Sequence, residues 1–111
     1  PSWEIPDFLS QLTALTYLSI GDNPLVGVVP PSIGSLVNLV SLNIARTGED
    51  GVRGALPYTL ARLTKLKELY LRNNGFKGRL PDFIGGLTNL EKLGLRETAF
   101  EGNIPTFLAT L

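Results

Sequence analysis

A leucine that returns at a fixed interval constrains this 111-residue chain more than any other feature. Within each interval, leucine recurs three and six residues after the first leucine, and Leu or Ile recurs after eight. A chain with this self-similarity forms a stack of like units, each contacting only its neighbours. The opening leucines, spaced by 24, 27, 24 and 24 residues, are Leu12, Leu36, Leu63, Leu87 and Leu111.

The spacing predicts one repeat domain over residues 1–111. We expect a partial repeat at 1–11 and full repeats at 12–35, 36–62, 63–86 and 87–110. The opening segment counts as the tail of a further repeat because Pro6 stands 24 residues before Pro30, and each full repeat has a proline at that place. We therefore expect the chain to be a piece of a longer solenoid.

Each repeat contains a short segment in which apolar residues alternate with others, the pattern of a half-buried β-strand. The segments read YLSIG, SLNIA, ELYLR and KLGLR. Most parallel sheets are covered on both faces and read as continuous apolar runs. The alternation here predicts that one face of the sheet meets solvent or a partner, and this face is the candidate for binding. The positions expected to point inward are Leu18, Ile20, Leu42, Ile44, Leu69, Leu71, Leu93 and Leu95.

After each predicted strand the chain has to bend, and the same position of each bend carries Asn or Thr. A side chain buried in a bend can satisfy backbone groups that would otherwise lack a partner. We expect a structural ladder of hydrogen bonds between turns, formed by Asn23, Thr47, Asn74 and Thr98.

The return path of each repeat carries glycine and proline, which permit close backbone approach and fix an extended geometry. On this convex side we expect short helical or 3₁₀ turns that place Ile33, Leu60 and Ile84 in the core. The second repeat is three residues longer than the others, and Gly48–Gly54 is expected to be a protruding, mobile surface loop. Such insertions map to one face of a repeat protein, which can bind.

The repeats resemble the plant-type leucine-rich-repeat family, whose consensus is LxxLxxLxLxxNxLxGxIPxxLxx, and the resemblance runs from Ile5 to Leu111. The segment PDFLSQLTALTYL is also similar to stretches in polygalacturonase-inhibiting proteins and in receptor-like kinase and receptor-like protein ectodomains. The resemblance implies an α/β-type solenoid. It would be a right-handed superhelix with a short parallel β-sheet on the concave face and loops or 3₁₀ turns on the convex face.

The outward positions of the four strands form columns across the concave face, where a partner would be recognised. The first two strands offer small polar residues, whereas the last two carry charge and an exposed tyrosine. Tyrosine and arginine are enriched at interface hot spots. The alternative is a solvated polar face with splayed arginines. The candidate partner-binding residues are Tyr17, Asn43, Arg46, Glu68, Tyr70, Arg72, Asn73, Lys92, Arg96 and Glu97.

Two contacts are expected between neighbouring strands about 4.8 Å apart. Glu68 and Lys92 can pair, whereas Arg72 and Arg96 face each other with like charge. A carboxylate or other anion from a partner would relieve that repulsion. Peptide receptors of the plant-type leucine-rich-repeat family, which this chain resembles, often hold a peptide's terminal carboxylate with an Arg-x-Arg pair on one strand. Here the two arginines lie on adjacent strands.

The composition bears on which functions are open to the chain. Histidine and cysteine are absent, so imidazole bases, thiol nucleophiles and zinc sites built from them are excluded. Ten basic and ten acidic residues give zero net charge, which argues against nucleic-acid binding. The longest apolar run is only a few residues, too short to span a membrane. No catalytic residues, no metal site at Glu49 and Asp50, and no cofactor are expected.

The sequence leaves three functional hypotheses. The first is a non-catalytic protein- or peptide-binding module in a receptor-like or inhibitor-like ectodomain, extracellular or at the cell surface. The second is a structural scaffold subunit of a multiprotein complex, intracellular or organellar. The third is an intracellular repeat adaptor. No Asn-x-Ser/Thr sequon and no cysteine-bearing cap is present, which weighs against the first hypothesis.

Overall fold

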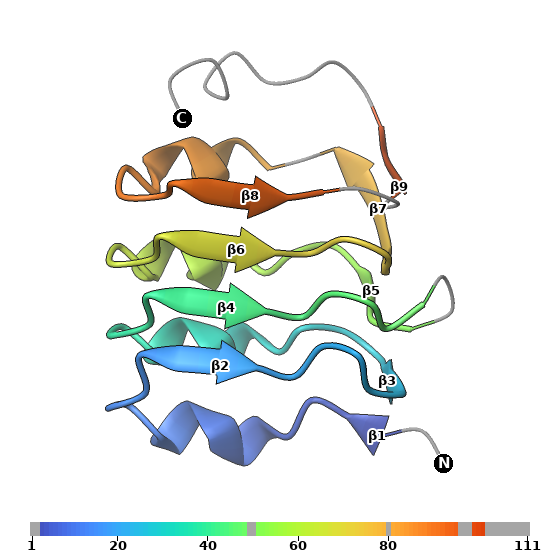
Figure 1. The fold of residues 1–111 in the computed structure, drawn as a ribbon, viewed down its shortest axis with the longest axis horizontal. Coiled ribbons are helices and arrows are strands. Elements are labelled where there is room, and N and C mark those ends of the chain that lie inside the picture. The colour runs from blue at the N-terminus through green and yellow to red at the C-terminus, as the bar shows by residue number, and fades with distance from the viewer. Residues whose placement is uncertain (1–2, 49–50, 80, 96–98, 102–111) are drawn as a thin grey trace.

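The computed structural model describes residues 3–48, 51–79, 81–95 and 99–101, which form a stack of similar turns (Figure 1). One strand from each of four turns lies in a single parallel sheet of order β2-β4-β6-β8. The pairing is in register, with Leu18 beside Leu42, Leu42 beside Leu69, and Leu69 beside Leu93. The strands are β2 (Tyr17–Ser19), β4 (Ser41–Asn43), β6 (Glu68–Tyr70) and β8 (Lys92–Gly94).

A 3₁₀ helix lies behind the sheet in each turn (Figure 1), as the sequence predicts. Proline precedes each helix in an extended conformation, and it fixes the backbone angle from which the helix starts. Ile33, Leu60 and Ile84 are buried, so their predicted place in the core is confirmed. The helices are η1 (Asp7–Gln11), η2 (Pro31–Ser35), η3 (Tyr58–Arg62) and η4 (Asp82–Gly86).

A second row of short parallel strands runs along the flank, and the sequence analysis did not predict it. Its sheets have the orders β1-β3 and β5-β7-β9, and a single bridge joins Gly27 to Val52. Partners in this row are offset: Trp3 pairs with Leu25 and Lys77 with Ala99. The strands are β1 (Trp3–Glu4), β3 (Leu25–Val26), β5 (Arg53–Gly54), β7 (Gly75–Arg79) and β9 (Ala99–Glu101).

The core between the sheet and the 3₁₀ helices is built from the repeated leucines. Those of the two inner strands are fully buried, whereas Leu18 and Ile20 at one edge of the sheet and Leu93 and Leu95 at the other are half-buried. The inward orientation predicted for all eight positions is therefore confirmed. The fully buried members in the inner strands and just after them are Leu42, Ile44, Leu69 and Leu71.

The insertion in the second repeat corrects the sequence analysis. Gly48–Gly54 was expected to protrude as a whole, but Gly51 and Val52 are buried, and Arg53–Gly54 form β5. The Gly51 N–H donates to the Gly48 carbonyl, which closes the loop, and Val52 takes the core place that Leu25 and Phe76 hold in neighbouring turns. Burial of Val52 returns the chain to the regular repeat after the insertion, because each turn places one apolar side chain at this position of the core. Residues 49 and 50 lie outside the described residues.

Close packing between η2 and η3 gives a testable prediction. A Cβ on Gly34 would lie 2.6 Å from the Thr59 Cβ and 2.7 Å from the Thr59 carbonyl oxygen. We expect Gly34→Ala to lower the free energy of unfolding by about 1–3 kcal/mol, because overpacking forces neighbours to move. Urea denaturation measures the loss. Gly86→Ala is the control, since no atom of the described residues outside its own helix lies within 4 Å of its added Cβ. Equal losses in both variants would contradict the packing argument.

Candidate functional site

The open face of the sheet β2-β4-β6-β8, called here the concave face, carries the predicted columns. Strand pairing places each predicted neighbour beside the next, which confirms the columns within the described residues. The alternation of each strand directs these side chains away from the core. One column holds Tyr17, Ser41, Glu68 and Lys92, and the next holds Ser19, Asn43, Tyr70 and Gly94.

Among the described residues, two ion pairs link neighbouring turns on this face. Lys92 Nζ lies 3.6 Å from Glu68 Oε2, as the sequence predicts. Arg46 Nε lies 2.7 Å from Asp22 Oδ1, a pair that the sequence analysis did not predict. Both pairs are substantially exposed, so each contributes only about 0–1 kcal/mol to stability. Their effect here is to give Arg46 and Lys92 acidic partners within the chain.

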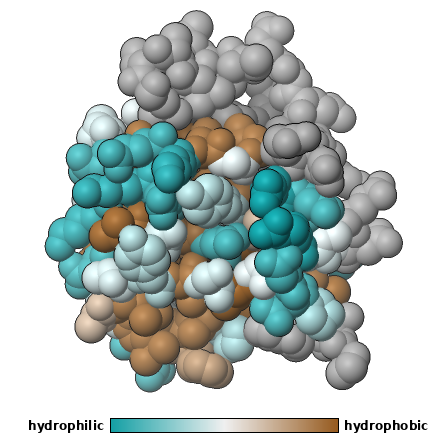
Figure 2. All heavy atoms as spheres, viewed as in Figure 1, coloured by the Kyte–Doolittle hydropathy of each residue, from teal (hydrophilic) through white to brown (hydrophobic). Residues whose placement is uncertain are grey.

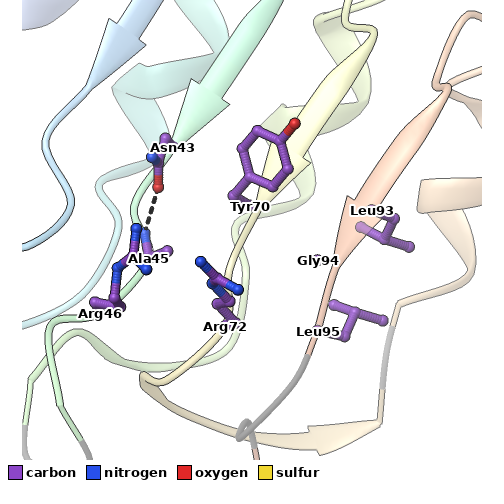
Figure 3. Close-up of a pocket in the computed structure, with 8 residues that line it drawn as sticks. All are labelled: Asn43, Ala45, Arg46, Tyr70, Arg72, Leu93, Gly94 and Leu95. Atoms are coloured by element: carbon purple, nitrogen blue, oxygen red, sulfur yellow. Dashed lines mark hydrogen bonds between the residues drawn. The ribbon is translucent and has the colours of Figure 1, made fainter.

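A hollow of about 450 Å³ lies between the ends of β4, β6 and β8 (Figure 3). In the close-up, Asn43, Tyr70 and Arg72 project from adjacent strands around it. Its walls are polar on the β4 and β6 side and apolar on the β8 side. The lining residues are Asn43, Ala45, Arg46, Tyr70, Arg72, Leu93, Gly94 and Leu95.

Hydrogen bonding determines which atoms the hollow presents. The Ala45 N–H donates to Asn43 Oδ1 over 2.8 Å, which turns the amide nitrogen of Asn43 away from that bond. Arg72 is half-buried, and within the described part of the chain it has no carboxylate within ion-pair distance. None of the described residues that line the hollow is acidic. The site therefore offers mainly hydrogen-bond donors and positive charge.

The tyrosine of the hollow is positioned by a glycine on the next strand. A Cβ on Gly94 would lie 3.2 Å from Tyr70 Cδ1. The Tyr70 ring therefore occupies space that a larger residue at position 94 would restrict. Tyr70 is half-buried, in contrast to Tyr17, which is 65% exposed and does not line the hollow. Burial of one side of the ring favours Tyr70 over Tyr17 as an anchor for a partner.

The structure brings only part of the predicted set together. Asn43, Arg46, Tyr70 and Arg72 line the hollow. Glu68 and Lys92 pair with each other outside it, and Tyr17 lies in the same column, separated from Glu68 by Ser41. Asn73 contributes its carbonyl to the Thr47 and Gly48 N–H groups. Sequence reasoning did not select Ala45, Leu93, Gly94 and Leu95, because small or inward positions carry no sign of lining a surface. Arg96, Glu97 and Thr98 lie outside the described residues.

The structural ladder is clearest at Asn74, which is buried. Its Nδ2 donates to the carbonyl of Ile44 in the preceding turn and to that of Leu71, and its Oδ1 accepts from Thr47 Oγ1. Thr47 Oγ1 in turn accepts from the Val52 N–H over 3.1 Å. Asn23 differs from the expectation of a buried side chain: it is exposed and bonds carbonyls of its own turn, because it lies in the edge turn.

A second ladder, missed by the sequence analysis, runs along the turns that lead into the strands. Asn38 Nδ2 donates to the Thr13 carbonyl, and Asn89 Nδ2 donates to the Thr64 carbonyl one turn back. Lys65 Nζ donates to Asn38 Oδ1 over 2.8 Å. The signal was present in the sequence as asparagine two residues after the opening leucine of the second and fourth repeats.

Neither a metal site nor a membrane span is found in the described ranges. Among those residues no group of three or more acidic side chains is placed to hold a metal ion. No helix in this part of the structure is long and apolar enough to cross a membrane.

Comparison with known proteins identifies the repeat. The Leucine Rich Repeat family model matches residues 14–36 and 65–87. The chain is 41% identical over 58 residues to Receptor like protein 22 of Arabidopsis thaliana, a match covering 52% of the chain and 8% of that protein. The Arabidopsis receptor kinase HAESA ectodomain, solved with the peptide hormone IDA, is 30% identical with a TM-score of 0.88, over 96% of this chain and 18% of that chain.

A further solved structure, the BIR3–SERK2 complex from Arabidopsis thaliana, contains a chain that is 29% identical with a TM-score of 0.90. This match covers 99% of the present chain and 57% of that chain. The molecule is thus a leucine-rich-repeat solenoid. More particularly, its repeats are similar to those of a plant receptor-like protein and of receptor-kinase ectodomains. It spans a small part of the first relatives, 8% of the receptor-like protein and 18% of HAESA.

Proposed function

We propose that this domain is a non-catalytic binding module whose concave hollow receives an anionic, acceptor-rich group of a peptide or protein partner. The observation that carries the proposal is the half-buried Arg72, which has no acidic partner among the described residues and lines the same hollow as Asn43. A carboxylate can accept from both side chains, and charge-assisted hydrogen bonds of this kind are the strong ones.

The relatives support the proposal. HAESA was solved with a peptide hormone and BIR3 in complex with SERK2, so similar domains bind both peptides and proteins. By analogy we place the whole protein outside the cell or at its surface. The module has no cofactor in this proposal, and it neither enters the membrane nor binds nucleic acid through this site.

The size of the concave face limits what one such domain binds alone. Four strands about 4.8 Å apart make a strip on the order of 300 Å², while a stable interface takes about 800 Å² per partner. We therefore expect the hollow to hold one anchoring group, such as a peptide terminus. The remaining contact would come from other surfaces of the protein or its assembly.

A panel of acetylated tetrapeptides, each made with a free and an amidated C-terminus, tests the proposal. We expect the free form to bind at least about tenfold more tightly, because a hydrogen bond to a charged group contributes about 1.5–3 kcal/mol. Arg72→Gln should remove this preference. Arg53→Gln, which removes an exposed arginine on the flank strand β5, should keep it. NMR titration measures the affinities. Equal binding of both forms to the parent domain would refute the carboxylate site.

The alternative is a structural subunit held in a larger assembly through its ends and flanks. The exposed Val28, Val37 and Tyr58, which lie on turns inside the stack, favour it because they offer apolar surface for a neighbour. This alternative predicts that a co-purifying partner is retained by the Arg72→Gln variant. The Arg72→Gln variant thus distinguishes binding at the hollow from assembly through the ends and flanks.

A further inference from the structure

The basic residues of the chain are concentrated in its middle. All ten Lys and Arg residues lie between residues 46 and 96, and residues 1–45 contain none. Figure 2 shows hydrophilic side chains in two areas of this face, one right of the centre and one on the left, where the turns into β6 and β8 lie in Figure 1. The zero net charge therefore hides a local excess of positive charge.

Three of these cations share one short turn. The turn from η3 into β6, residues 62–67, carries exposed Arg62, Lys65 and Lys67. Leu63 and Leu66 between them are fully buried. The Leu63 N–H donates to the Leu60 carbonyl, and the Leu66 N–H donates to the Leu63 carbonyl. The turn is therefore anchored every third residue, and its cations are displayed from a fixed backbone.

The fold does not require these cations. The same turn in the first, second and fourth repeats has the same leucine anchors and hydrogen bonds, yet reads QLTALT, SLVNLV and GLTNLE. None of these three turns contains Lys or Arg. Since the backbone forms equally well without the cations, their presence in one turn calls for a reason other than folding.

The cations are also free to meet a partner. Lys65 is held by the neutral Asn38 Oδ1, which fixes its position while leaving its charge without a counter-ion. Within the described residues, Arg62 and Lys67 form no ion pair, and Glu68 at the end of the turn is engaged by Lys92. Exposed, positioned and unpaired cations attract acidic partners and raise the rate of encounter.

We propose that this turn, residues 62–67, is a docking site for an acidic surface loop of a partner protein, separate from the concave hollow. A stiff polyanion would contact a row of cations running across successive repeats, whereas here the cations follow one turn and the turns on both sides have none. A compact group of carboxylates matches that arrangement. Arg62 can bind one carboxylate through two parallel hydrogen bonds, and the two lysines act as point charges.

The test uses a fluorescein-labelled Glu/Asp hexapeptide with an amidated C-terminus, so that no terminal carboxylate reaches the hollow. The triple variant Arg62→Ser, Lys65→Asn, Lys67→Val installs the residues of the second repeat, a turn that the fold already accepts. Anisotropy at low salt should show about a tenfold loss, because three exposed ion pairs contribute a factor of about two each. Added salt should narrow the difference.

Matched single variants sharpen the result. Lys65→Asn and Arg53→Ser each remove one exposed cation, and only Lys65→Asn should weaken binding of the hexapeptide. Binding by the triple variant within twofold of the parent, or an equal loss in Arg53→Ser, would overturn the proposal. Tighter, turn-dependent binding of a long polyuronate would overturn the choice of an acidic loop. A loss of hexapeptide binding that is larger in Arg72→Gln than in the triple variant would assign the peptide to the hollow and overturn the proposal, whereas a loss confined to the triple variant supports this turn as a site separate from the proposed function.

Discussion

Replacing Asn74 by alanine is expected to lower the free energy of unfolding by about 3 kcal/mol. The amide of Asn74 donates to the carbonyls of Ile44 and Leu71 and accepts from Thr47. Each hydrogen bond contributes about 1 kcal/mol. In the alanine variant the three former partners of Asn74 would remain where water does not take the place of the amide. The loss is large for a domain of this size, whose total stability is about 5–15 kcal/mol.

The control for this prediction is Asn23→Ala. Asn23 has the same place in the first repeat, but it is exposed and bonds only within its own turn. We expect a loss of less than about 1 kcal/mol, because water can satisfy the freed carbonyls. Urea denaturation of both variants gives the comparison. Similar losses at the two positions would mean that the bond to the preceding turn contributes nothing.

Replacing Tyr70 by alanine is expected to weaken binding of the tightest free-carboxylate tetrapeptide about thirtyfold. Tyr70 is the aromatic wall of the hollow, and its ring rests in the space that Gly94 leaves open. Truncating an interface hot spot costs about 2 kcal/mol or more, which is roughly thirtyfold in affinity. Isothermal titration calorimetry measures the change.

Two further variants help to interpret the effect of Tyr70→Ala. Tyr70→Phe should keep most of the affinity if the ring surface is what matters, and lose it if the hydroxyl is the essential contact. Tyr17→Ala removes an exposed tyrosine on the same face that does not line the hollow, so it should bind like the parent. A loss at Tyr17 equal to that at Tyr70 would place the contact along the whole face instead of at the hollow.

The fold was predictable from the sequence because each repeated position has one physical task. The period of two in the strands fixes which side chains face the core, and strict spacing between repeats fixes the register that places Glu68 beside Lys92. The 3₁₀ helices followed from proline and the apolar residue three positions later. These features are local, so one repeat predicts the next.

The flank sheet and the hollow were harder to predict. The strands of the flank pair with an offset that the alignment of repeats does not reveal, as for Trp3 with Leu25. Ala45 and Gly94 carry no functional group, yet their small size makes room for the hollow. The pairing of Arg46 with Asp22 leaves Arg72, among the described residues of the hollow, as the arginine available to a ligand. This choice depends on side-chain geometry and not on residue type.

The closed loop between Thr47 and Val52 has a consequence for engineering. The second repeat accommodates three more residues than its neighbours and still returns Val52 to the core, with the Thr47 hydroxyl accepting from its N–H. This bend therefore accepts three additional residues, while the layers on either side keep their spacing. An affinity tag or a fluorophore-binding peptide inserted at this bend would leave the sheet that carries the hollow undisturbed, because Thr47 and Val52 on either side are held by their own hydrogen bond.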